Sequence, residues 1–272
     1  MEFLTLLNFK SNYHMCYFNS INLNIGDIIK ISNKEKKIDK KIQSNVTSGF
    51  EYTQWPIIKD NHNSTDLILE MAHWEFIPSW INSSKELTLS REKFTTLNAK
   101  AENLLDSRMY RDAALKRRCL VLSSGFYEWR HYKPMGAKKE NAYPYFISVP
   151  GQHYFFMAGI YQPWTDKATG ETIDSFAIVT TAANTLMAKV HNKKKRMPCL
   201  LNESLASEWL QEDLKETRIK EIANFRSADD HMQAYSIRKD FKITSDPQEK
   251  FIYPELPPLD QSEGFTNELP FV

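Results

Sequence analysis

The sequence predicts a single domain of mixed strands and helices, and three observations support this prediction. The chain has 272 residues, enough to bury one substantial core. Short apolar runs typical of strands are separated by polar, turn-forming segments, and they lie at 67–78, 117–129, 143–149, 153–161, 175–181, 197–201 and 232–238. Helical spacing of apolar residues indicates helices at 104–116, 184–191 and 203–225.

Charge and cysteine content exclude several classes of protein. With 35 basic and 34 acidic residues the chain is not a polycation, so a nucleic-acid surface would need local clusters such as Lys34–Lys41 and Lys193–Arg196. The alternative for each cluster is a solvated loop. The three cysteines form no C-x-x-C pair, which argues against a disulfide framework and a structural zinc site. We therefore expect neither a metal nor a cofactor.

Targeting signals are weak. No apolar run reaches the length of a membrane span, and the first residues lack the basic start and long apolar stretch of a secretion signal. We expect a cytoplasmic protein, associated with the nucleoid if its source is bacterial. Residues 1–14 are interpreted as a leader, which the working protein would lack if translation begins at Met15.

Signals along the amino-terminal part of the chain are less distinct. A Lys- and Asn-rich region near the start is expected to be loop with a short helix, and Thr53–Pro56 to be a turn. The strand at 67–78 ends in W-E-F-I-P-S-W (74–80), an aromatic loop that either packs or stacks bases, with packing favoured. After N-A-K-A-E (98–102), the helix at 104–116 leads into the next strand.

The most informative stretch is R-R-C-L-V-L-S-S-G-F-Y-E-W, residues 117–129. Strand geometry places Glu128 on the same face as Phe126, and Gly125 permits a bulge or a close backbone approach. A carboxyl group beside an aromatic ring is partly desolvated, which favours a pKa at which it both gives and takes protons. The alternative is an edge-strand glutamate paired with an arginine, and these residues alone favour neither interpretation.

The end of the chain differs in composition from the rest. The strand at 232–238 is expected to close a sheet, whereas residues 241–272 are rich in Pro, Glu and Asp and indicate an extended tail with little core of its own. The folded domain is therefore expected to span residues 15–240.

Cys16 is a candidate nucleophile because it follows Met15. Removal of that methionine would leave an N-terminal cysteine, whose α-amine has an ordinary pKa of about 7.7 to 8.0 and lies beside the thiol. Such a 1,2-aminothiol condenses with an aldehyde to a thiazolidine ring. The alternative is that Cys16 is an ordinary small hydrophobic residue. No G-x-G-x-x-G, G-x-x-x-x-G-K-[ST], H-E-x-x-H or G-x-S-x-G motif supports another chemistry.

Two further polar residues are candidates. His191, shortly before R-M-P (196–198), has a side chain suited to proton transfer near neutral pH, although a lone histidine is more often structural. Asn98 offers a donor and an acceptor that can hold an opened sugar or an amide, and its alternative role is a helix cap. Cys119 and Cys199 lie within apolar strand patterns and are expected in the core.

Taken in order, Met15-Cys16, W-E-F-I-P-S-W, N-A-K-A-E, the 117–129 stretch and His191 with R-M-P resemble the SOS response-associated peptidase (SRAP) family. The resemblance extends over about residues 15 to 240. It implies an α+β fold: a single SRAP-like domain of curved, mostly antiparallel sheets with peripheral helices and a positively charged cleft. It also implies an N-terminal cysteine that crosslinks to abasic sites in single-stranded DNA.

The resemblance assigns a role to each candidate. It gives crosslinking to Cys16, positioning of the sugar and amine to Asn98, acid/base chemistry to Glu128 and proton transfer to His191. The residues expected to contact DNA are Trp74, Lys100, Arg117, Lys193 and Arg196.

The chain departs from the family pattern at three places. Tyr17 and Phe18 stand where the family usually has Gly and Arg, so the phosphate contact that the resemblance implies near the start is not supported by these residues. Lys100 replaces a common Arg, keeping the charge but losing the bidentate fork. Residues 192–195 separate the histidine from R-M-P where one residue is commoner, so this longer loop adds phosphate contacts or shifts His191.

The predicted function is covalent capping of abasic sites in single-stranded DNA, by a monomer, in the response to DNA damage. One alternative is a cysteine peptidase that acts on its own leader, which would turn over peptides. The other is a non-catalytic binder of single-stranded or modified DNA, whose affinity would survive the loss of Cys16.

Overall fold

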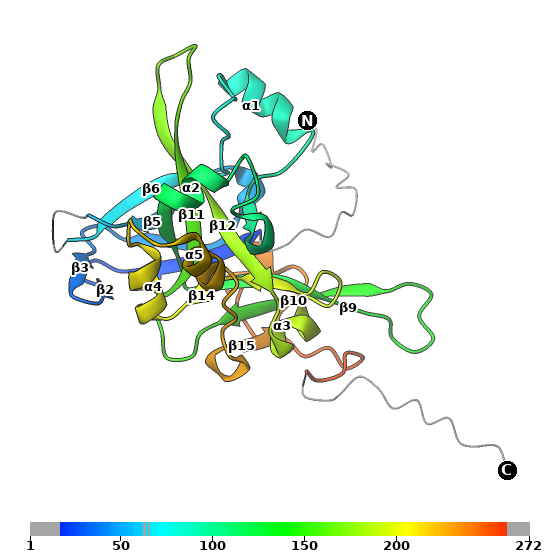
Figure 1. Ribbon diagram of the computed structural model, residues 1–272. Coiled ribbons are helices and arrows are strands. Elements are labelled where there is room, and N and C mark those ends of the chain that lie inside the picture. The colour runs from blue at the N-terminus through cyan, green and yellow to red at the C-terminus, as the bar shows by residue number, and fades with distance from the viewer. Residues whose placement is uncertain (1–16, 62–63, 65, 260–272) are drawn as a thin grey trace.

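The computed structural model of the protein describes residues 17–61, 64 and 66–259 (Figure 1). Residues 1–14, interpreted above as a leader, and Cys16 lie outside the described residues.

Five strands form a closed barrel, because β12 pairs with β6 on one side and with β11 on the other. Around the barrel the strands are β12 (Thr172–Ala182), β6 (Ile68–Trp74), β5 (Gln54–Lys59), β8 (Arg118–Ser123) and β11 (Phe155–Thr165). Three short strands extend it, namely β7 (Asn98–Lys100), β13 (Arg196–Pro198) and β14 (Leu200–Leu201). Closure leaves the paired barrel strands without a free edge and buries their inward side chains.

A five-stranded sheet packs beside the barrel. Its order is β15 (Gln233–Ser236), β10 (Asn141–Ser148), β9 (Gly125–Tyr132), β1 (Phe18–Leu23) and β4 (Ile42–Ser48). A separate hairpin is formed by β2 (Ile28–Ile31) and β3 (Lys34–Lys37). Pairing between the named strands is antiparallel except for β12 with β6 and with β7. The α+β fold class with mostly antiparallel, curved sheets is therefore confirmed.

Short helices lie around the sheets (Figure 1). They are α1 (Ser84–Arg91), α2 (Arg111–Lys116), α3 (Thr185–Val190), α4 (Glu203–Trp209) and α5 (Glu216–Ala223), with 3-10 turns η1 (Gly49–Glu51), η2 (Ala101–Asn103), η3 (Asp229–His231) and η4 (Phe241–Ile243). The side chains of Ser83, Asn184 and Asn202 accept backbone hydrogen bonds at the starts of α1, α3 and α4. These caps fix where each helix begins.

The chain passes from the barrel to the five-stranded sheet at Ser124. Ser123 Oγ, fully buried, donates to Gly125 O at 3.0 Å and closes this corner. A Cβ atom on Gly125 would lie 2.1 Å from Cζ of Phe146, so the ring of Phe146 occupies the space of a side chain. The predicted close approach at Gly125 is confirmed, but the predicted strand 117–129 is two strands, β8 and β9, in different sheets.

Three element predictions were wrong. The Lys- and Asn-rich region forms strands β1 to β4. In β2, buried Ile29 and Ile31 alternate with exposed Ile28 and Lys30, and β3 pairs with β2 in a hairpin. Thr53–Pro56 leads into β5 instead of turning, since Trp55 and Ile57 are buried. Only Arg111–Lys116 of the predicted helix 104–116 is helical, because adjacent Leu104 and Leu105 are both buried in turns.

The carboxy-terminal segment 244–259 forms no helix or strand, but it does pack on the domain. Just before it, Phe241 is buried and stacks on Tyr127, with ring centroids 4.9 Å apart. Tyr253 packs edge-on against Tyr143, also at 4.9 Å. The described part of the predicted tail has no helix or strand beyond the 3-10 turn η4, and it packs through Phe241 and Tyr253 against the domain.

Candidate functional site

Glu128 lies on β9, an interior strand of the five-stranded sheet, and its residue is 1% exposed. Across the sheet it faces Tyr145 of β10. Phe18 of β1 pairs with Tyr127, so the antiparallel register brings Tyr17, the first described residue, level with Glu128. Because β9 has strands on both sides, the edge-strand alternative for Glu128 is excluded.

His191 lies at the carboxy-terminal end of α3 and is 3% exposed. Its Nδ1 is 3.0 Å from the carbonyl oxygen of Arg196 and 3.8 Å from Oε1 of Glu128. A carbonyl oxygen can only accept, so Nδ1 carries a proton and Nε2 of a neutral ring is left to accept one. The structure thus brings together the two residues predicted to move protons, from segments more than sixty positions apart in the chain.

Asn192 is a site residue that the sequence did not reveal. Its Nδ2 donates to His131 O at 2.7 Å, and its Oδ1 accepts from His131 N at 3.0 Å. These two bonds fasten the residue after His191 to β9, the strand that carries Glu128. An asparagine in a lysine-rich loop is an ordinary turn residue in sequence, so only the neighbouring strand exposes this role.

Asn98 opens strand β7, so the helix-cap alternative for it is excluded. The hydroxyl of Tyr110 donates to Asn98 O at 3.5 Å. Burial, together with nearby Tyr17, raises the pKa of Tyr110 well above its ordinary value of 10.0. Tyr17 is therefore close to both the Asn98 side and the Glu128 side of the site. A cavity of about 420 Å³ lies here, lined by Asn98, Lys100, Asn103, Asp106, Ser107 and Tyr110.

Arg196 connects the N-A-K-A-E segment to His191. Its backbone carbonyl accepts from His191, while its guanidinium pairs with Glu102 and donates to Thr180 O at 2.6 Å. Partial burial acts to raise the pKa of Glu102, but the hydrogen bond and charge of Arg196 outweigh it, and the pKa is lowered. Arg196 therefore stabilises the site through its contacts with His191, Glu102 and Thr180, and its contact with DNA stays a prediction.

Two of the predicted DNA-contacting residues do not join this site. Trp74 is fully buried, stacks on Phe176 and donates its indole N–H to Leu97 O at 3.2 Å, so it cannot stack on a base. Arg117 lies at the opposite end of β8 from the corner that leads to β9, and it binds Gln162 and Asp112, each at 2.7 Å. The expectation for Trp74 is corrected by its burial, which the sequence motif does not reveal, whereas contact of Arg117 with DNA stays a prediction.

Lys100 and Lys193 are exposed. Lys193 Nζ lies 2.8 Å from Oε2 of Glu140, the residue just before β10. Both lysines are available at the surface near the Asn98 and His191 segments, and their contact with DNA stays a prediction.

Cys119 and Cys199 are buried in the core, as expected. Burial raises the pKa of the Cys119 thiol far above its ordinary value, and that of Cys199 to about 12. Neither can supply a thiolate near neutral pH. Among the chain's three cysteines, thiol chemistry is therefore left to Cys16.

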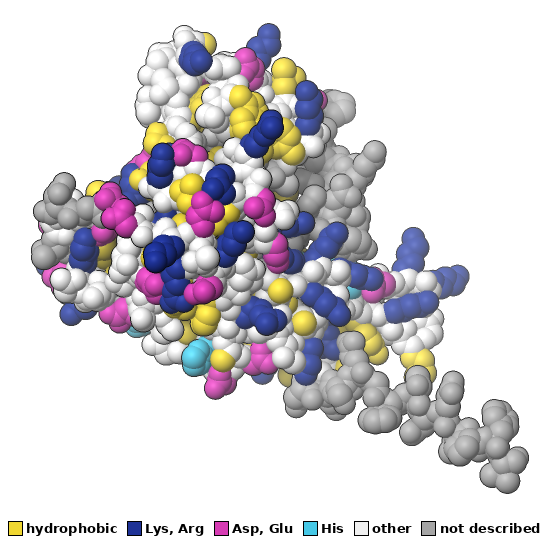
Figure 2. Space-filling model, in the orientation of Figure 1, with side chains coloured by type: hydrophobic (Ala, Val, Ile, Leu, Met, Phe, Trp, Pro, Cys, Tyr) yellow, Lys and Arg dark blue, Asp and Glu magenta, His cyan; other side chains and the backbone are white. Residues whose placement is uncertain are grey.

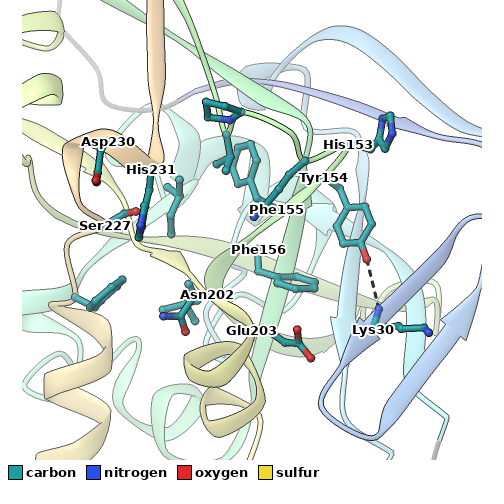
Figure 3. Close-up of a pocket in the computed structure, with 16 residues that line it drawn as sticks. Lys30, His153, Tyr154, Phe155, Phe156, Asn202, Glu203, Ser227, Asp230 and His231 are labelled. Carbon is teal, nitrogen blue, oxygen red and sulfur yellow. Dashed lines mark hydrogen bonds between the residues drawn. The ribbon is translucent and has the colours of Figure 1, made fainter.

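A second, larger cavity of about 590 Å³ lies away from the Glu128–His191 pair (Figure 3). Phe155 and Phe156 form apolar walls, His153 and His231 lie at its sides, and the hydroxyl of Tyr154 accepts from Lys30 N at 3.4 Å. It contains none of the predicted site residues. Within residues 17–61, 64 and 66–259, no three His, Cys, Asp or Glu side chains group as a metal site, and no helix has the length and apolarity to cross a membrane.

Comparison with known proteins finds relatives that share one description, abasic site processing protein. A protein of Saccharomyces cerevisiae named abasic site processing protein is 27% identical over 80% of this chain and 57% of its own length. Abasic site processing protein YoqW of Bacillus subtilis is 28% identical over 66% of this chain and 73% of its own. The protein HMCES of Xenopus tropicalis, of the same description, is 28% identical over 54% of this chain and 46% of its own. The chain thus spans about half the length of the yeast and frog relatives.

Solved structures show the same fold. A crystal structure of a protein from Bacteroides thetaiotaomicron superposes with a TM-score of 0.69 at 31% identity, covering 86% of this chain and 97% of that one. The sequence pattern of the SOS response associated peptidase (SRAP) family matches residues 15–243, most of the chain. Because this match covers well over half of the chain, the protein belongs to the SRAP family.

Proposed function

We propose that the protein captures abasic sites in single-stranded DNA by a covalent bond to Cys16, as part of the response to DNA damage. The observation that carries the proposal is the buried Glu128–His191 pair, 3.8 Å apart and level with Tyr17, the residue that follows Cys16. The names of the relatives, abasic site processing proteins, support the choice of substrate.

The chemistry proceeds by condensation. The α-amine of Cys16 attacks the aldehyde carbon of the opened abasic sugar, and loss of one water leaves an imine. The thiol sulfur then adds to the imine carbon while its proton passes to the nitrogen, which closes a thiazolidine ring. Opening the sugar and expelling water both need a group that gives and takes protons, and Glu128 is assigned to these transfers. His191 assists sugar opening, and Asn98 orients the sugar.

This chemistry requires a free α-amine, so the working protein is expected to begin at Cys16. An amide nitrogen at Cys16, with residues 1–15 still attached, cannot form the imine. Intact mass of the natively expressed protein tests this, because a preparation that keeps Met1 to Met15 and still crosslinks DNA would contradict the proposal.

The test of function is single-turnover crosslinking of an oligonucleotide with one abasic site, resolved on a denaturing gel. Cys16→Ala should abolish the heat-stable adduct, and His191→Ala should slow its formation. Asn224→Ala is a control, since the Asn224 side chain only donates to Lys220 O at the end of α5. A heat-stable adduct formed by Cys16→Ala would refute the covalent role and favour simple DNA binding.

A further inference from the structure

Six exposed lysines lie on two segments of the chain that meet beside His191. They are Lys133, Lys138 and Lys139 in the turn between β9 and β10, and Lys193, Lys194 and Lys195 in the loop after α3. The two segments, 132–140 and 192–195, contain one acidic residue, Glu140, and no arginine. Their formal charge is therefore +5, whereas that of the whole chain is +1. We call these two segments the hairpin–loop surface.

The two segments are joined by specific contacts, so their charges add at one place. Asn192 holds the backbone of His131 by two hydrogen bonds, and Lys193 Nζ lies 2.8 Å from Glu140. The β9–β10 hairpin projects from the body of the molecule (Figure 1), and Lys and Arg side chains gather over this side of it (Figure 2). The field of this surface is thus strongly positive and local.

The surface begins at the candidate site and leads away from it. Glu128 and Tyr132 are four positions apart on β9, about 13 Å, and the turn carries the lysines to roughly 20 Å. Phosphates along one stacked DNA strand are about 3.4 Å apart, so this length corresponds to about six nucleotides. A protein partner would need a larger apolar centre than Met135, the one exposed large apolar side chain on these segments.

We infer that the hairpin–loop surface binds the phosphates of the DNA strand on one side of the abasic site, out to about six nucleotides from it. The inference rests on the proposed function for the position of the abasic site. It assigns DNA as the ligand of the β9–β10 turn. It also explains why the loop that follows His191 contains three consecutive lysines.

The test measures non-covalent affinity by fluorescence anisotropy. The probes are single-stranded oligonucleotides with a tetrahydrofuran abasic analogue, which has no aldehyde. One extends eight nucleotides on both sides of the analogue, and two others are cut to two nucleotides on one side or the other. The triple variant Lys133→Gln, Lys138→Gln, Lys139→Gln is compared with the control Lys37→Gln, Lys40→Gln, Lys41→Gln. The control removes three exposed lysines at and just after β3, across the molecule from the β9–β10 hairpin in Figure 1.

The hairpin variant should bind the long oligonucleotide about tenfold more weakly, and its plot of log affinity against log salt should be shallower by about two. This loss should disappear when the strand is cut on one side and persist when it is cut on the other. The control variant should match the parent. Three results would each overturn the inference. The hairpin variant binds as tightly as the parent, the control variant loses as much affinity as the hairpin variant, or the loss is the same whichever side of the oligonucleotide is shortened.

The analogue separates this inference from the proposed function, because it cannot form a covalent bond. If the hairpin variant shows the one-sided loss of affinity but the parent protein never crosslinks a natural abasic site, the proposed function alone is contradicted. A parent protein that crosslinks but whose hairpin variant keeps full affinity would contradict the inference alone.

Discussion

The side-chain amide of Asn192 forms two hydrogen bonds with the backbone of His131, donating to its carbonyl oxygen at 2.7 Å and accepting from its N–H at 3.0 Å. These bonds connect the segment that follows His191 to β9, the strand that carries Glu128. The 3.8 Å separation of His191 and Glu128 depends on this connection because the two residues come from different elements. Asn192 is therefore expected to act as a positioning residue. Its side-chain amide bonds the backbone of His131, so its effect on the reaction is expected to pass through His191.

Asn192→Ala should lower the single-turnover crosslinking rate at saturating DNA by about tenfold to a hundredfold, the loss that small displacements of reacting groups produce. The pH dependence of the rate should also change, since the surroundings of His191 change. Asn192→Asp keeps the acceptor and should retain more of the rate. A rate and pH profile equal to those of the parent, despite a lower melting temperature, would show that Asn192 is only structural.

Glu128→Gln keeps the size of the side chain but removes its ability to exchange a proton. The crosslinking rate should fall by about a hundredfold or more. DNA affinity should change less than about twofold, because Glu128 is buried and carries none of the phosphate contacts. Glu208→Gln is the matched control, since Glu208 pairs with Arg218 on the α4–α5 side. Crosslinking of Glu128→Gln at the parent rate would contradict the assigned acid/base role.

The sequence predicted the parts of the site that depend on short motifs and missed those that depend on packing. Glu128 and His191 were found because each residue type suits proton transfer, and the sheet brings them together. Trp74 was misassigned because an aromatic residue at the end of a strand is equally compatible with a core and with a stacking surface, and here it is fully buried. Asn192 was missed because its partner is the backbone of β9, to which no side-chain motif points.

The same division holds for the fold. The barrel strands β11 and β12 were predicted from continuous apolar, β-branched runs, as buried strands require. Strands β2 and β3 were missed because β3 contains no apolar residue, and the two buried isoleucines of β2 form too short a pattern. The break between β8 and β9 depends on Gly125 and on a ring more than twenty residues away, which sequence spacing cannot place.

Gly125→Ala should destabilise the corner between the two sheets. The added methyl group would lie 2.1 Å from Phe146 and 3.0 Å from the carbonyl oxygen of Ile147. Forcing a group into a packed site costs about 1 to 3 kcal/mol, which lowers the melting temperature by about 3 to 10 °C for a domain of this size. Phe146→Leu in the same chain should restore part of the loss. A melting temperature equal to the parent's would show that the corner relaxes freely.

His131 should make the protein less stable as the pH falls. Burial chiefly, with the charges of Lys193 and His191, holds the pKa of His131 below its ordinary value of 6.5, although Glu140 opposes them. The unfolded chain therefore binds this proton more readily, so the free energy of unfolding decreases as pH drops below about 6.5. Urea unfolding at pH 7 and pH 5 should show a smaller decrease for His131→Gln than for the parent. Equal decreases in both proteins would contradict this contribution.

The segment after the family match stabilises the domain through a buried arginine. Arg130 is 1% exposed, and its Nη1 donates to the carbonyl oxygen of Pro257 at 2.6 Å. A chain that ends at Ile243, where the family match ends, loses this acceptor and the packing of Tyr253 on Tyr143. Hydrogen bonds to charged groups contribute about 1.5 to 3 kcal/mol, and an aromatic pair adds about 1 kcal/mol.

The shortened chain should therefore unfold at a lower urea concentration, with a loss of about 2 to 4 kcal/mol in the free energy of unfolding. A chain that ends at Leu259 is the control, because it keeps Pro257, Tyr253 and the bond from Lys189 Nζ to Leu259 O. Equal stability of the two chains would mean that residues 244–259 lie on a domain that is already complete at Ile243. A loss of stability in the chain that ends at Ile243, but not in the chain that ends at Leu259, would show that residues 244–259 belong to the folded domain.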